Sequence, residues 1–128
     1  MTRKTYNTRE REVGKIAEGV AKATCKVMLD KECELVKENG GVVDGNGLLP
    51  LSVSYDMGWS KQGRAHNSLT GHGAVMGSLT GKALDFTMKN KLCRTCQSAR
   101  QTEGNPKPHD CRLNHQMSSK SMEPLSAV

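Results

Sequence analysis

Residues Val53 to Asp85 read VSYDMGWSKQGRAHNSLTGHGAVMGSLTGKALD, and this stretch decides the fold that the sequence predicts. Leu51, Val53 and Tyr55 alternate with polar residues, which is the pattern of a half-buried strand. Met57-Gly58 then interrupts that pattern. We therefore expect Asp56 to lie at the end of a first strand, on its polar face.

Two further apolar runs follow in the same stretch. Residues 74–76 lie between two glycines, and residues 83–88 follow a Thr80-Gly81 turn. Strands joined by connections this tight pair in an antiparallel manner. The sequence thus predicts a three-stranded antiparallel meander, in which the histidines His66 and His72 flank a turn and have a packing role.

The residues before the meander have the spacing of a helix. Asn7 with Glu10 three positions later resembles a capping box, and apolar residues then recur at mostly helical intervals. The predicted helix runs over Thr8–Glu38 and ends at Gly40-Gly41, after a lead-in that we expect to be disordered. Two glycines in its first half leave two shorter helices as the alternative. We expect this helix to pack against or connect other parts of the chain, and the alternatives are direct DNA contact and dimer formation.

Three cysteines and two histidines near the other end of the chain have the spacing of a metal site. Cys93 and Cys96 form a C-x-x-C pair, followed by His109 and Cys111, with His115 four residues further on. Zinc takes four sulfur or imidazole ligands in a tetrahedron, and a C-x-x-C turn supplies two of them. Either histidine fits as the fourth ligand, and free thiols are the alternative. A closed four-ligand site would be structural.

These patterns define the expected organisation, an α+β chain with a zinc-binding loop over 92–115. We expect a helical N-terminal segment at 1–41, a turn-rich linker at 42–50, and the meander with the zinc loop at 51–128. The apolar share is only 35%, with one Phe, one Trp and two Tyr, so any hydrophobic core is small.

The charge balance suggests a partner. The formal net charge is +6, and the stretch 86–102 contains basic residues and no acid. Such a stretch can lie along a phosphate backbone, or it can be a solvated surface. The candidate nucleic-acid-binding residues are Lys61, Arg64, Lys89, Lys91 and Arg94.

The composition also bears on location. No apolar run approaches the ~18 residues needed to cross a bilayer, so we expect a soluble chain with no membrane partner. Five cysteines is an odd number, and three of them lie in the metal-like arrangement. Reduced thiols in an intracellular compartment fit that arrangement better than a disulfide framework.

An ordered series of motifs resembles a known family. From about Thr8 onward the chain is similar to the Mutator-like transposase domain, whose core is ribonuclease H-like and whose chemistry is of the DDE/D class. The motifs are D-x-G-W-S-K-Q-G at 56–63, N-S-L-T-G at 67–71, T-G-K-x-L-D at 80–85, C-x-x-C at 93–96, P-H-x-C-x-x-N-H at 108–115 and S-S-K-S-M-E-P at 118–124.

The resemblance implies several properties. Asp56 matches the first of three catalytic carboxylates, which in an intact catalytic domain bind Mg²⁺ or Mn²⁺. His109 is favoured as the fourth zinc ligand. The implied partner is DNA at transposon ends, and the implied location is the nucleus.

The chain reaches Val128 before the family's later carboxylates. We therefore expect a fragment of a DNA transposase catalytic domain that is inactive alone, with an incomplete ribonuclease H-like sheet. Open sheet edges suggest self-association or pairing with the parent transposase. The alternative is a small zinc-stabilised module that binds DNA or protein without catalysis. A third hypothesis is a metal-dependent nuclease that uses Asp56 with Asp85.

Overall fold

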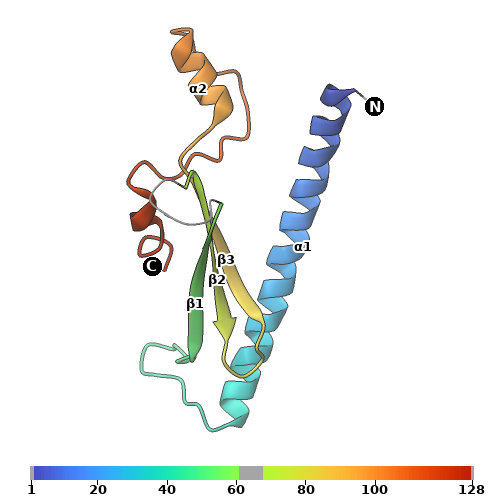
Figure 1. Ribbon diagram of the computed structural model, residues 1–128. Coiled ribbons are helices and arrows are strands. Elements are labelled where there is room, and N and C mark those ends of the chain that lie inside the picture. The colour runs from blue at the N-terminus through green and yellow to red at the C-terminus, as the bar shows by residue number, and fades with distance from the viewer. Residues whose placement is uncertain (1, 61–67, 128) are drawn as a thin grey trace. The chain divides into compact units, whose positions relative to one another are not determined.

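The computed structural model describes residues 2–60 and 68–127 and has the expected α+β class. A long helix is followed by three antiparallel strands in the order β1-β2-β3 and two short helical segments (Figure 1). The elements are α1 (Arg3–Glu38), β1 (Val53–Trp59), β2 (Thr70–Gly77), β3 (Ala83–Asn90), α2 (Arg94–Gln101) and the 3-10 helix η2 (Ser119–Met122).

The chain divides into two compact units. The first consists of residues 1–54 with 75–86, and it contains α1 and the hairpin turn between β2 and β3. The second consists of residues 55–74 with 87–128, and it contains the cysteine- and histidine-rich segment.

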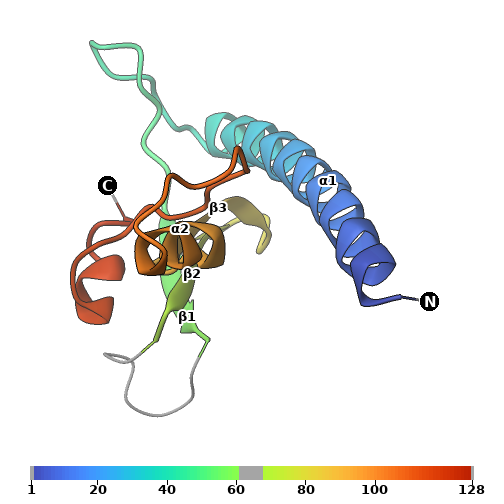
Figure 2. The same cartoon turned by 90° about the horizontal axis from the view of Figure 1, so that it is seen from above.

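Helix α1 starts earlier than the sequence pattern predicts. It runs unbroken from Arg3 (Figures 1 and 2), so the predicted start at Thr8, the disordered lead-in and the option of two helices are wrong. The hydroxyl of Thr2 accepts a hydrogen bond from the backbone N–H of Thr5 at 3.3 Å and so caps the helix. The C-terminal prediction is confirmed, because the helix ends at Glu38 and Gly40 has a φ of 85°.

A buried carboxylate joins α1 to the β2–β3 turn. Glu32 is 0% exposed. Its two oxygens accept hydrogen bonds from the backbone N–H groups of Leu79 at 2.9 Å and Thr80 at 2.8 Å. A side chain on Gly77 would collide with this carboxylate, so glycine is needed where the turn begins. The Glu32 carboxylate is stabilised although it is buried, because backbone N–H groups of the turn replace the water molecules that would otherwise hydrogen-bond to it.

The electrostatics of Glu32 follow from those contacts. The Thr80 hydroxyl and then the backbone N–H of Leu79 donate hydrogen bonds that hold the pKa of Glu32 below its ordinary value of 4.5, although burial opposes the shift. The role of Glu32 is not predictable from the sequence, because one acid among many on a polar helix carries no distinguishing pattern.

The first strand continues past the predicted break. Met57 is buried within β1, and Gly58 is followed by Trp59 before the strand ends, so the predicted interruption at Met57-Gly58 is wrong. A side chain at Gly58 would collide with the imidazole of His72 on β2. Small residues therefore face large ones between these strands, and glycine here serves close approach rather than a turn.

The second strand is also longer than predicted. Strand β2 begins at Thr70 instead of residue 74, and His72 lies on it with an exposed side chain instead of flanking a turn. His66 lies outside the described residues. The turn at Thr80-Gly81 is confirmed, since Gly81 has a φ of 63° and donates its N–H to the carbonyl of Gly77 at 3.0 Å.

The apolar core is small, as the composition predicts. Four apolar residues are buried among the described residues, namely Cys25, Met57, Leu84 and Met122. As many polar residues are buried, namely Glu32, Ser68, His115 and Ser119. Each of these polar side chains has hydrogen-bond partners, as when the Ser119 hydroxyl donates to the carbonyl of Ser68 at 2.6 Å. Polar contacts thus contribute a large part of the specific packing.

In the second unit, Asn114 pairs with the outer edge of β3. Its side-chain oxygen accepts a hydrogen bond from the backbone N–H of Asn90 at 2.7 Å, and its side-chain nitrogen donates to the carbonyl of Met88 at 2.7 Å. The backbone N–H groups of Asn114 and His115 both donate to the carbonyl of Asn90 at 3.1 Å. A side-chain amide therefore takes the place of a peptide group on a neighbouring strand.

Replacing Glu32 should destabilise the first unit. Glu32→Gln leaves one acceptor oxygen for two N–H groups, so the melting temperature at pH 7 should fall by roughly 5 °C. The matched control is Glu34→Gln, because Glu34 is exposed on the same helix. Differential scanning calorimetry measures both. Equal melting temperatures for the two variants would contradict the assigned role.

The stabilisation by Glu32 should depend on pH. Its folded pKa lies below the ordinary 4.5, so the native state binds the proton more weakly than the unfolded state. The stability gap between wild type and Glu32→Gln should be complete above pH 4.5 and shrink as the pH falls through the lowered pKa. Urea unfolding at several pH values measures this gap, and a gap that widens in acid would refute the assignment.

Candidate metal centre

The first two candidate ligands are placed by a short helix that the sequence analysis did not predict. Cys93 lies just before α2 in an extended conformation, and its carbonyl accepts a hydrogen bond from the N–H of Gln97 at 2.9 Å. Cys96 lies in the first turn of α2. The segment 92–115 is therefore not all loop. Unpaired N–H groups at a helix N-terminus favour thiolates at such positions.

Four side chains converge beside the start of this helix. The sulfur atoms of Cys93, Cys96 and Cys111 and a ring nitrogen of His109 all lie within 4.8 Å of one another. Cys93 and Cys96 are half-buried, and the other two residues are exposed. The sequence prediction that these four residues form one group is confirmed.

The distances in this group fit a tetrahedral metal. The Sγ atoms of Cys96 and Cys111 are 3.6 Å apart, and Nε2 of His109 lies 3.1 Å from Sγ of Cys93 and 3.5 Å from Sγ of Cys96. Ligands around a tetrahedral zinc ion lie roughly 3.5 to 3.8 Å apart. The cluster could therefore hold a metal such as zinc with little movement.

A backbone contact sets the orientation of His109. Its Nδ1 lies 2.7 Å from the carbonyl oxygen of Lys107. Only a protonated Nδ1 can donate to that carbonyl, so in the neutral ring Nε2 has its lone pair directed at the thiols. Metal-binding histidines commonly have this second contact, which fixes the tautomer.

The other candidate histidine has a different role. His115 is 4% exposed, and its Nε2 lies 2.8 Å from the carbonyl of Ser118 and 3.2 Å from the hydroxyl of Ser121. This nitrogen is engaged in the packing around η2 and is not among the four converging ligand atoms. Of the two alternatives, the geometry therefore selects His109.

The close approach of the sulfurs perturbs their protonation. The backbone N–H of Cys96 donates to Cys93 and lowers the pKa of that thiol to about 6. The thiol of Cys111 raises the pKa of Cys96 to about 11, and the carbonyl of Lys107 raises the pKa of His109 to about 9. Ionisation of Cys93 is thus favoured, and its negative charge opposes ionisation of the neighbouring thiols. A divalent cation among the sulfurs would relieve that repulsion.

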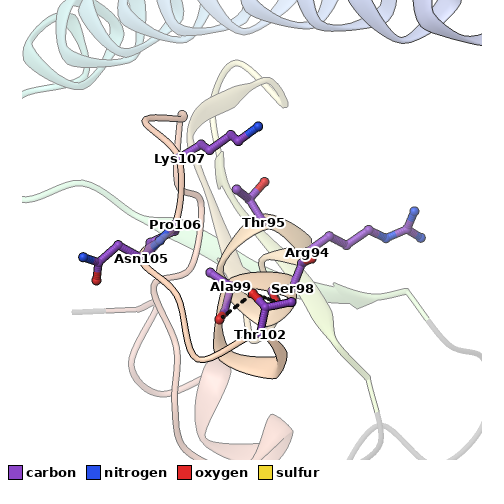
Figure 3. Close-up of a pocket in the computed structure, with 8 residues that line it drawn as sticks. All are labelled: Arg94, Thr95, Ser98, Ala99, Thr102, Asn105, Pro106 and Lys107. Carbon is purple, nitrogen blue, oxygen red and sulfur yellow. Dashed lines mark hydrogen bonds between the residues drawn. The ribbon is translucent and has the colours of Figure 1, made fainter.

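Basic side chains surround this cluster. A surface hollow of about 430 Å³ lies between α2 and the segment that follows it, and Arg94 and Lys107 extend from it in the same general direction (Figure 3). Its lining is Arg94, Thr95, Ser98, Ala99, Thr102, Asn105, Pro106 and Lys107. Lys91 and Arg100 line a separate hollow, and together with Cys93 and Cys96 they line a further one. Lys107 is not predicted as part of this basic group, because it lies outside the basic stretch along the chain.

The predicted carboxylate site is less complete. Asp56 lies within β1 instead of at its end, is exposed, and accepts a hydrogen bond from the N–H of Met57 at 2.9 Å. Among the described residues it belongs to no group of three or more potential metal ligands. Asp85 is exposed as well. Lys61 and Arg64 lie outside the described part of the chain, and Lys89 is half-exposed on β3.

Comparison with known proteins identifies a family. The family model described as Mutator-like transposase matches residues 1–128. No curated protein and no solved structure matches the chain. In the part of the chain that the structure describes, no helix is long and apolar enough to cross a membrane.

The four-residue group should bind one metal ion per chain. Cobalt(II) added to the reduced chain should give the thiolate charge-transfer and visible bands of a tetrahedral cobalt site with three sulfur ligands, and zinc should displace it. Cys111→Ser should weaken the affinity by roughly 100-fold or more.

Two substitutions outside the group serve as controls. Cys33→Ser removes a thiol on α1, and His115→Gln changes the histidine that contacts Ser118. Both should leave the cobalt spectrum unchanged, whereas His109→Gln should alter it. A spectrum lost with His115→Gln and retained with His109→Gln would reverse the assignment.

Proposed function

The chain belongs to the Mutator-like transposase family, and we propose that it contributes a DNA-contacting part of a ribonuclease H-like, DDE/D-class catalytic domain. The family match over 1–128 is the observation that carries this proposal. Its substrate would be DNA at transposon ends, and its working location the nucleus.

Within this proposal Asp56 is the first catalytic carboxylate. Its side chain is exposed on β1, an edge strand of the sheet, where further ligands can approach it. Two-metal phosphoryl transfer needs several carboxylates around Mg²⁺ or Mn²⁺, which activate the attacking oxygen and stabilise the leaving one. Asp56 alone cannot supply that site, so residues 1–128 alone would be inactive.

The cysteine and histidine group has a structural role in this proposal. Three thiolates and one imidazole complete the four positions of a tetrahedral zinc ion, which leaves no position for substrate. The bound ion would fix α2 relative to the segment that contains His109 and Cys111. It would thereby hold the surrounding cations in place.

Those cations are the proposed DNA contacts. Arg94 and Lys107 line one hollow, where Ser98 and Thr102 add hydroxyl groups, and Lys91 and Arg100 line a second hollow with Cys93 and Cys96. Lysine, arginine and hydroxyl groups contact phosphate oxygens without reading base sequence. Lys89, Lys61 and Arg64 are further candidates from the sequence.

A zinc-stabilised binding module without catalysis is the second candidate. The observation in its favour is that Asp56, among described residues, lies in no group of potential metal ligands. Both candidates predict DNA binding, and they differ in whether Asp56 matters for strand transfer.

DNA binding should be salt-dependent and should involve the cations beside the ligand group. Replacing Lys91, Arg94 and Lys107 together with alanine should weaken binding of duplex DNA. It should also reduce the slope of log affinity against log salt by roughly 3. The control is a triple alanine variant at Lys4, Lys15 and Lys37, which removes the same charge from α1. Fluorescence anisotropy at several salt concentrations measures both. Equal losses would mean that net charge alone decides.

Asp56 should be essential for catalysis in a transposase that contains this domain. Asp56→Asn should reduce Mg²⁺-dependent strand transfer to background while DNA binding stays within about twofold, because the metal site loses a charged ligand. Asp85→Asn, which also changes an exposed strand aspartate, is the matched control. Full activity of the Asp56 variant would exclude the catalytic role and favour the binding module.

A further inference from the structure

Helix α1 has two different faces. One face packs within its unit and includes the buried Cys25 and Glu32. The other face presents large apolar side chains to solvent. They are Tyr6, Val13, Ile16, Val20 and Val27, with exposed fractions of 56%, 62%, 68%, 61% and 58%.

The exposed apolar residues follow a seven-residue repeat. Tyr6, Val13, Val20 and Val27 are each seven positions apart, and Ile16 and Ala23 fall three positions after a valine. These are the a and d positions of a coiled coil, with apolar residues at every a position and Arg9 and Asp30 at the two outer d positions. At about 100° per residue, this apolar stripe lies roughly opposite the packed face. A partner on it would therefore not compete with the packing inside the unit.

The first half of α1 has no burial of its own. Every residue from Arg3 to Ala17 is exposed. A helical segment of about 15 residues that packs against nothing is only marginally stable in water. The polar side chains of this segment do not supply the missing apolar contacts. A helix partner along the stripe would supply the missing packing. The same stripe on a second copy of α1 is such a partner.

We propose that α1 pairs in an antiparallel coiled coil with α1 of a second copy of this chain, centred near Glu18. In this register Ile16 of one copy packs against Val20 of the other, and Val13 packs against Ala23. The pairing is self-complementary, as a two-fold dimer requires.

Charge selects the antiparallel direction. Glu12 and Lys26 each directly precede an a residue, which is the g position of the repeat. In an antiparallel pair, g positions of the two helices face each other, so Glu12 of each copy faces Lys26 of the other. A parallel pair in register would instead place Lys26 against Lys31 and would bring Arg9 of the two copies together. Opposite charges thus flank the antiparallel interface twice, whereas like charges flank the parallel one.

The centre of the proposed interface has small residues at its flanks. Ala17 and Gly19 occupy the positions on either side of the apolar stripe nearest to Glu18. A side chain added at Gly19 would meet nothing within 4 Å. Two helices can therefore approach closely where the copies cross. The apolar pairs of this register cover residues 13–23, and beyond them Val27 meets Arg9 and Tyr6 meets Asp30 of the other copy. The coil is therefore short, and we expect a dissociation constant on the order of micromolar.

Sedimentation equilibrium of the zinc-loaded chain 1–128 tests the proposal. The wild type should be a monomer–dimer mixture in the micromolar range, and Val20→Lys should raise the dissociation constant by roughly tenfold or more. The matched control is Leu29→Lys, since Leu29 is 36% exposed on α1 but lies off the stripe. Circular dichroism establishes that both variants keep their helix. A wild type that stays monomeric at high concentration, or equal effects of the two variants, would overturn the proposal.

Charge exchange tests the direction without touching the apolar residues. Glu12→Lys and Lys26→Glu should each weaken the homodimer, and an equimolar mixture of the two variants should restore dimers by forming opposite pairs in both flanks. In a parallel pair Lys26→Glu would strengthen the homodimer by removing the repulsion from Lys31. That strengthening, or a mixture no tighter than the single variants, would overturn the antiparallel arrangement.

Discussion

The carboxylate of Glu32, buried against the N–H groups of Leu79 and Thr80, is the constraint on which the first unit depends. A chain with four buried apolar residues among those described cannot fix a long helix by apolar contact alone. The Glu32 carboxylate fixes the position of the helix along its axis, because a shift of one residue would separate the carboxylate from the backbone N–H groups that donate to it. The second unit has an analogous tie in its convergent thiols and imidazole.

Much of this architecture could be predicted from local pattern. Alternation and turn-bounded apolar runs located the three strands, and ligand spacing located Cys93, Cys96 and Cys111 with either His109 or His115, because these signals arise within a few residues of one another along the chain. The family resemblance is likewise confirmed over 1–128. The ribonuclease H-like core and the role of Asp56 remain proposals.

What the sequence did not predict depends on contacts between distant segments. Gly58 reads as a strand breaker until the imidazole of His72 is seen to occupy its side-chain space. Spacing left His109 and His115 open, and the family resemblance favoured His109; the structural reason is the carbonyl contacts at Lys107 and Ser118, which no spacing rule contains. Helix α2 is short and has no buried residue, so its sequence carries no apolar period. Lys107 joins the basic surface only through the path of the loop.

The pairing of Asn114 with Asn90 bears on how the metal-binding segment is assembled. These residues hold the beginning and the end of the segment together, so it is a closed loop whose ends are fixed by the protein itself. The hydrogen bonds at β3 then offset most of the entropic cost of closing this loop. A metal ion has to order only the residues inside the loop. Loss of the ion would loosen the interior of the loop while its ends stayed attached to the sheet, so that rebinding could proceed without refolding the strands.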